Sequence, residues 1–168
     1  MIGGTIYMNP SYFRIKLNME EAVKRLCAWN EGSYKERIET NYSNAVRVSI
    51  DQNGNWKGQC LYAYEKDGWT VFEDLSGGYS VNEIDSWLNF AEKDELIFAG
   101  YNDAIIYAEM IVVKDGEVTK YFMECDDCPE ENVNQGNGIP NIENWVDVAS
   151  YVDEDKFVYS EQGIVYIF

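Results

Sequence analysis

The segment Glu95–Glu124, ELIFAGYNDAIIYAEMIVVKDGEVTKYFME, decides the fold class that we expect for this chain. It holds three runs rich in apolar, β-branched and aromatic residues, which are typical of strands. Turn-forming pairs separate the runs, at Asn102-Asp103 and at Asp115-Gly116. Short turns join neighbouring strands in opposite directions, so the segment predicts an antiparallel meander. The predicted strands cover residues 95–101, 104–114 and 117–124.

The region before this segment predicts a second group of antiparallel strands. Residues 45–50 alternate between apolar and polar side chains, and the Asn53-Gly54 pair that follows is typical of a tight hairpin turn. A second turn at residues 66–68 leads into another β-rich run. These strands are predicted at 45–50, 56–64 and 69–75, and two short closing strands at 157–159 and 164–168.

Three helices are predicted from apolar residues at helical spacing. The first covers 19–29 behind the capping residue Asn18, and the second covers 81–92 behind a capping box formed by Ser80 and Glu83. The third covers 142–152. Because hairpins and helices do not alternate strictly, we expect an α+β fold in a single domain over residues 1–168. Its mainly antiparallel sheet would have about six to eight strands and three helices.

The charge of the chain limits the partners that it can bind. Thirty Asp and Glu residues against thirteen Lys and Arg give a formal net charge of −17, and residues 85–168 hold nineteen of the acids but only four of the bases. Nucleic acid and anionic membranes are therefore poor partners. The start of the chain, residues 1–10, lacks the basic and apolar pattern of a secretory signal. We expect a cytoplasmic protein, and the sequence leaves its oligomeric state open.

The side chains that most enzymes use are few in this sequence. There is no histidine, which removes Ser-His and Cys-His pairs and the commonest general base near neutral pH. Cys125-Asp-Asp-Cys128 has the spacing of a redox pair or of half a zinc site, but Cys27 and Cys60 fit no zinc module. Acidic neighbours also disfavour the thiolate that redox chemistry needs. We expect four ordinary cytosolic thiols, no catalytic residue, no metal and no cofactor.

Clusters of carboxylates near predicted turns are the strongest functional signal. Carboxylates on a folded scaffold steer an electropositive partner, and neighbouring tyrosines supply buried anchors. The sequence therefore predicts a binding surface for a basic protein. Its candidate residues are Glu73, Asp74, Tyr101, Asp103, Asp126, Asp127, Glu130, Glu131, Tyr151, Asp153, Glu154 and Asp155.

Part of the chain, over about residues 45–125, resembles a known group of proteins. The stretches that carry the resemblance are Gly68–Gly77 (GWTVFEDLSG), the helix around Trp87 and Phe98–Asp103 (FAGYND). They look like the small acidic immunity proteins encoded beside bacterial polymorphic toxins and contact-dependent growth inhibition toxins. The resemblance implies a cytoplasmic antidote that is not an enzyme. It would bind a cognate toxin domain, often a nuclease, and block or distort its basic active site.

Two other functions remain as alternatives. Spaced carboxylates could imitate the phosphates of nucleic acid, so that the protein inhibits several DNA-binding proteins with strong salt dependence. Alternatively, the carboxylate clusters could hold Mg²⁺, Mn²⁺ or Ca²⁺ in a metal-dependent hydrolase. Binding to one basic protein, to many DNA-binding proteins or to a metal ion distinguishes the three functions.

Overall fold

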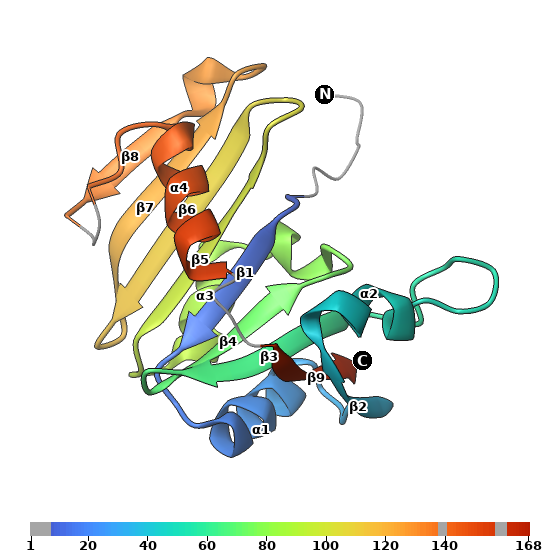
Figure 1. The fold of residues 1–168 in the computed structure, drawn as a ribbon. Helices are drawn as coiled ribbons and strands as arrows, with labels where there is room; N and C mark the ends of the chain where they lie inside the picture. The colour runs from blue at the N-terminus through green and yellow to red at the C-terminus, as the bar shows by residue number, and fades with distance from the viewer. Residues whose placement is uncertain (1–7, 138–140, 157–160) are drawn as a thin grey trace.

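The computed structural model describes residues 8–137, 141–156 and 161–168. In these ranges the protein is α+β, with one antiparallel sheet of nine strands and four α-helices (Figure 1). The predicted fold class is confirmed, while the predicted six to eight strands and three helices are too few. No helix within these ranges has the length and apolar character needed to cross a membrane.

The elements follow one another in a mixed order along the chain. The strands are β1 (Ser11–Ile15), β2 (Glu36–Asn41), β3 (Cys60–Lys66), β4 (Trp69–Asp74), β5 (Leu96–Asn102), β6 (Tyr107–Lys114), β7 (Glu117–Cys125), β8 (Val133–Gly136) and β9 (Gln162–Ile167). The helices are α1 (Met19–Trp29), α2 (Tyr42–Ser49), α3 (Ile84–Ala91) and α4 (Trp145–Lys156), with short 3₁₀ helices η1 (Gly78–Val81) and η2 (Pro129–Glu131).

The sheet has the strand order β2-β9-β3-β4-β1-β5-β6-β7-β8. Strand β1 lies at its centre, where it pairs with β4 on one side and β5 on the other. The last strand, β9, lies between β2 and β3. The predicted meander is confirmed as β5-β6-β7, with Asp115 and Gly116 at positive φ in the tight turn between β6 and β7.

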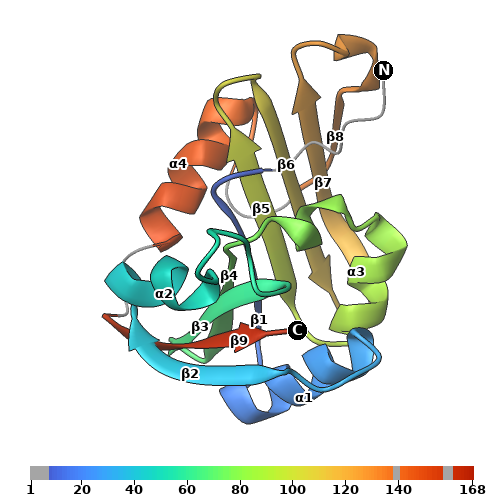
Figure 2. The same ribbon diagram turned by 90° about the vertical axis from the view of Figure 1, so that its right-hand side faces the viewer.

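Helices cover both faces of the sheet and divide the core into two parts (Figures 1 and 2). Helices α1 and α3 contact each other and pack on one face, where α3 also contacts β6. Helices α2 and α4 pack on the other face, α2 over β9 and α4 over β5 and β6. This arrangement buries the central strands on both sides and leaves the loops at the strand ends exposed.

The core on the α1 and α3 face is centred on Phe13 of β1. This side chain is fully buried, and its ring lies 5.0 Å from that of Phe72 and 5.1 Å from that of Trp87. Trp87 also stacks on Phe98 at 4.6 Å. Aromatic rings at these separations gain more than the burial of apolar area alone. The cluster therefore joins β1, β4, β5 and α3 into one packed unit.

The region around residues 45–50 differs from the prediction. It forms helix α2 instead of a strand, because the Asn41 side chain accepts a hydrogen bond from the Asn44 amide and so caps a helix. Ala45 and Ser49, four residues apart, then both face the core. The predicted hairpin is reduced to a single bridge between Ile50 and Trp56, and the strand predicted over 56–64 begins only at Cys60.

The predicted helices agree with the structure to different degrees. The first is confirmed, with Asn18 accepting from the Glu21 amide. The second is interrupted, because Ser80 donates to the Gly77 carbonyl in η1 and α3 begins only at Ile84. The third is displaced toward the carboxyl end, as α4. Strands β1, β2 and β8 were not predicted, and the strand predicted at 157–159 lies outside the described residues.

Candidate functional site: an acidic tip closed by a disulfide

Five exposed carboxylates lie on neighbouring loops at one end of the sheet, the upper end in Figure 1. Strand β5 ends, β6 begins and β7 ends at this edge, and the loops that follow carry the acidic side chains. We call this surface the acidic tip. Its members are Asp103 in the β5–β6 turn, Asp126 and Asp127 after β7, and Glu130 and Glu131 in η2.

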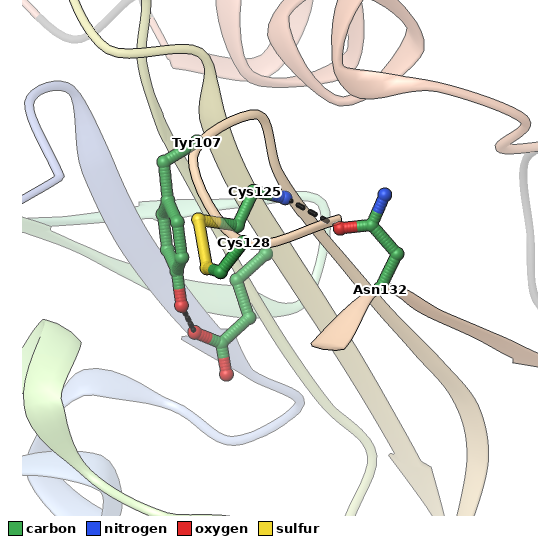
Figure 3. The surroundings of a disulfide bond; sticks show 5 residues. Tyr107, Cys125, Cys128 and Asn132 are labelled. Atoms are coloured by element: carbon green, nitrogen blue, oxygen red, sulfur yellow. Dashed lines mark hydrogen bonds between the residues drawn. A yellow bond between two sulfur atoms is a disulfide. The ribbon is translucent and has the colours of Figure 1, made fainter. Parts of the chain in front are cut away.

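Backbone hydrogen bonds hold the loops of the acidic tip in place. The Asp126 amide donates to the Ile106 carbonyl at 3.0 Å, which ties the β7 loop to the β5–β6 turn. The Asn132 side chain accepts from the Cys125 amide at 2.7 Å (Figure 3). The Glu131 amide donates to the Cys128 carbonyl at 2.9 Å. These hydrogen bonds therefore fix the backbone that carries the carboxylates of the acidic tip.

Cys125 and Cys128 form a disulfide within this loop, where the sequence predicted two ordinary thiols. Their Cα atoms are 5.2 Å apart, within the usual range for a disulfide. Cys125 is buried at the end of β7, whereas Cys128 is partly exposed. Figure 3 shows the Tyr107 ring of β6 beside the disulfide. The other cysteines, Cys27 and Cys60, are free thiols.

A buried carboxylate, Glu109, lies two residues beyond Tyr107 on β6, on the same face of the sheet. Glu109 of β6 is 9% exposed, and its Oε2 accepts a hydrogen bond from the Tyr107 hydroxyl at 3.2 Å. Burial raises the pKa of Glu109 to about 7, against the lowering effect of this hydrogen bond. Burial, followed by the charge of Glu109, raises the pKa of Tyr121 on β7. Glu109 is thus a carboxyl group that changes its charge near neutral pH.

The Lys and Arg side chains that form ion pairs in the described ranges lie away from the acidic tip. Lys16 and Lys114 both pair with Glu95 at the opposite end of strands β1, β5 and β6. Arg25 of α1 pairs with Glu92 and Asp94, next to α3. Within the described ranges, no carboxylate of the acidic tip takes part in an ion pair. The tip therefore projects an unbalanced negative field into solvent.

The structure places Glu73 and Asp74 inside the protein, which corrects their prediction as surface residues. Glu73 is 7% exposed and Asp74 is 4% exposed, because β4 is an inner strand with both faces covered. The Asp74 carboxylate accepts from the amides of Gly77 and Tyr79, each at 2.9 Å, and so fixes the turn after β4. Burial raises the pKa of Asp74 to about 6. Neither carboxylate is accessible to a partner.

The remaining predicted residues belong to α4 and the strands beneath it. The Tyr101 hydroxyl donates to Asp153 at 3.1 Å, and burial, followed by this carboxylate, raises the pKa of Tyr101. Tyr151 stacks on Tyr12 at 6.5 Å and accepts a hydrogen bond from Arg14, so it has a packing role. The charge of Asp103, a member of the acidic tip, also contributes to the raised pKa of Tyr101, so this set borders the tip at that residue. Asp153 and Glu154 are exposed inside α4 instead of after it, and the side chain of Asp155 is outside the described part.

Sequence reasoning missed Glu109 and the disulfide as members of this region. The signal for Glu109 was a single carboxylate interrupting the apolar run 104–113, which is costly to bury and therefore informative. The signal for the disulfide was the two-residue spacing of Cys125 and Cys128. Among the residues that the structure describes, no three Cys, Asp or Glu side chains are arranged to hold a metal ion.

The chain was compared with family models, with curated proteins and with solved structures. None of the three comparisons finds a match.

Proposed function

We propose that the protein is an immunity protein that binds a basic toxin domain through the acidic tip and neutralises it. The observation that carries the proposal is the placement of Asp103, Asp126, Asp127, Glu130 and Glu131 on adjacent ordered loops, exposed and without cationic partners in the described chain. An electropositive active site, such as that of a nuclease, is complementary to this surface. The toxin assignment rests on the resemblance of residues 45–125 to acidic immunity proteins.

Two physical effects favour such binding. The negative field of the tip steers a basic partner during diffusion and raises the association rate. The disulfide and the loop hydrogen bonds hold the carboxylates before the partner arrives, so less conformational entropy is lost on binding. The buried Glu73 and Asp74 have no part in this surface.

The first experiment is a pull-down of the tagged protein from a lysate of its own host, at low and at high salt, with mass spectrometry of the retained proteins. The proposal expects one basic protein at a near one-to-one ratio, whose toxic or nucleolytic activity is lost when this protein is added. Retention of several unrelated DNA-binding proteins, all released at high salt, would instead support nucleic-acid mimicry. Retention of no basic protein would contradict the proposal.

Charge reversal on the tip tests where the partner binds. We expect the combined changes Asp126→Lys, Asp127→Lys, Glu130→Lys and Glu131→Lys to slow association at least about tenfold at low salt, because steering is reversed. The difference should shrink in 0.5 M NaCl, where charges are screened beyond about 4 Å. Stopped-flow or surface-based binding kinetics measure both rates.

A matched variant controls for the change in net charge. It reverses four exposed acids away from the tip: Glu20 in α1, Asp67 in the β3–β4 turn, Asp115 in the β6–β7 turn and Glu117 at the start of β7. Circular dichroism checks that both variants are folded. Equal association rates for the two variants would show that net charge, and not the acidic tip, determines binding.

A further inference from the structure

The Cys125–Cys128 disulfide is not needed to hold the sheet together. Cys125 and Cys128 enclose only two residues, and closing so short a loop removes little entropy from the unfolded chain. The strands beside it are already joined through seven residue pairs from Leu96↔Val113 to Asn102↔Tyr107 and through the β6–β7 ladder. Cleavage of this bond would leave the fold intact.

The two cysteines differ in their exposure to solvent. Cys125 is 4% exposed and pairs with Tyr107 in the ladder, while Cys128 lies in the loop and is partly exposed. Thiol–disulfide exchange requires an external thiolate to approach one sulfur in line with the bond that breaks. The Cys128 sulfur is therefore the one that an external thiolate attacks, and Cys125 is the leaving group.

The surrounding charges act on that approaching thiolate. Asp126 and Asp127 lie between the two cysteines, and Glu130 and Glu131 follow after Pro129 in η2. All four are exposed, and at distances of a few ångströms such charges change the local concentration of small ions severalfold. An anionic thiol is repelled from this loop, and a thiol that carries a positive charge is concentrated there.

We propose that the Cys125–Cys128 disulfide is a reducible thiol–disulfide exchange site whose carboxylates select cationic thiols, or a dithiol protein with a basic surface, as the reductant. This inference stands independently of the toxin partner. It assigns the acidic loop a chemical substrate class in addition to a binding role.

The reaction balances in two steps. A thiolate from the reductant attacks the Cys128 sulfur, a mixed disulfide forms, the Cys125–Cys128 bond breaks and Cys125 leaves as a thiolate that takes a proton from water. A second thiolate, from the same dithiol or from another thiol molecule, then attacks the reductant's sulfur and releases Cys128. The reductant is oxidised to a disulfide, and the cysteine pair gains two electrons and two protons.

The test measures the rate of cleavage with three monothiols of different charge: cysteamine, 2-mercaptoethanol and 2-mercaptoethanesulfonate. Samples are quenched with a maleimide, and mass spectrometry of the peptide that contains both cysteines gives the reduced fraction without interference from Cys27 and Cys60. Each rate constant is corrected for the thiolate fraction of its thiol and divided by the rate with an uncharged model disulfide. We expect cysteamine to react at least about tenfold faster than the sulfonate at low salt, and this ratio to fall in 1 M NaCl.

Two variants separate the effect of the loop from that of net charge. Neutralising the loop with Asp126→Asn, Asp127→Asn, Glu130→Gln and Glu131→Gln should bring the ratio close to that of the model disulfide. The matched control, Glu20→Gln, Asp67→Asn, Asp115→Asn and Glu117→Gln, should keep most of the selectivity. If both variants behave alike, or if the three thiols react equally with the original protein, the proposal is wrong.

A final measurement excludes reduction through global unfolding. Direct attack requires a rate that rises in proportion to thiol concentration, while circular dichroism of the reduced protein retains the folded spectrum. A rate that levels off at the unfolding rate, or loss of the fold on reduction, would overturn the proposal. None of these readouts uses the toxin, so failure of the proposed function would leave the result of this test unchanged.

Discussion

Replacing Glu109 with glutamine is expected to raise the free energy of unfolding at pH 8 by about 2 to 3 kcal/mol. The glutamine oxygen keeps an acceptor for the Tyr107 hydroxyl, while the buried negative charge is removed. The pKa of Glu109 is about 7 in the folded protein, against an ordinary value of 4.5. The folded state therefore binds this proton more tightly than the unfolded state does.

The sign of the pH dependence follows from that difference. The stability linked to the protonated Glu109 carboxyl is fully present below pH 4.5 and is lost as the pH rises from 4.5 to about 7. Asp74 acts in the same direction between its ordinary pKa of 3.8 and about 6. At pH 4.5 the gain from Glu109→Gln should thus fall below about 1 kcal/mol.

Urea unfolding of both proteins at a series of pH values measures this gain. Glu117→Gln, an exposed change on β7, is the control and should change the free energy of unfolding by less than about 0.5 kcal/mol at every pH. A Glu109→Gln variant that is less stable than the original protein at pH 8 would show that the ionised carboxylate is stabilised by its surroundings and is not merely desolvated.

Replacing Phe13 with alanine should destabilise the protein by about 4 kcal/mol, the largest effect that we expect from one substitution. The ring is fully buried on the central strand, and aromatic side chains from four other elements surround it: β4, α1, η1 and α3. Its removal leaves a cavity that helices α1 and α3 cannot fill without moving away from the sheet. Chemical denaturation measures the loss.

Two further variants test whether the filled volume or the ring contacts of Phe13 account for this loss. Phe13→Leu retains most of the volume and should lose much less stability than Phe13→Ala. Val81→Ala, at a side chain that is 51% exposed, should change the free energy of unfolding by less than about 0.5 kcal/mol. Equal losses for Phe13→Ala and Phe13→Leu would mean that the ring contacts, and not the filled volume, stabilise this core.

The sequence predicted those parts of the fold that depend on local interactions. The β5-β6-β7 meander was found because β-rich runs and turn residues lie next to each other in the chain. Helix α1 was found because its cap and its apolar face lie within one segment. In both cases short-range physics determines the structure.

Elements that depend on distant partners were missed. Strand β1 has only five residues and is held between β4 and β5, which lie far along the chain. Strand β2 is polar and forms only because β9 supplies a paired edge. For α2, the β-branched residues Val46 and Val48 alternate as in a strand, and the Asn41 cap was the local evidence for a helix.

The difference between local and distant interactions also explains which parts of the candidate site the sequence predicted. The carboxylates after β7 were placed correctly at a strand end, since a polar run after an apolar strand is a local signal. Burial of Glu73 and Asp74 depends on β1 and β3 pairing on either side of β4, which no local pattern reports. The Cys125–Cys128 spacing permits a disulfide, and a local hydrogen bond from the Cys128 amide to the Cys125 carbonyl at 3.3 Å closes the turn between them. The distant contribution is the Asp126 amide, which donates to the Ile106 carbonyl and fixes the loop beside β6.

The position of β9 has a consequence for the synthesis of this protein. Because β9 lies between β2 and β3, the sheet cannot be completed while residues 162–167 are still inside the ribosome. Until then β3 lacks one neighbour, and β2 has none of its pairing partners. A nascent chain with an open strand edge is exposed to incorrect pairing. We therefore expect this protein to reach its native state only after translation has passed β9, and chaperones that shield nascent strands to raise its yield.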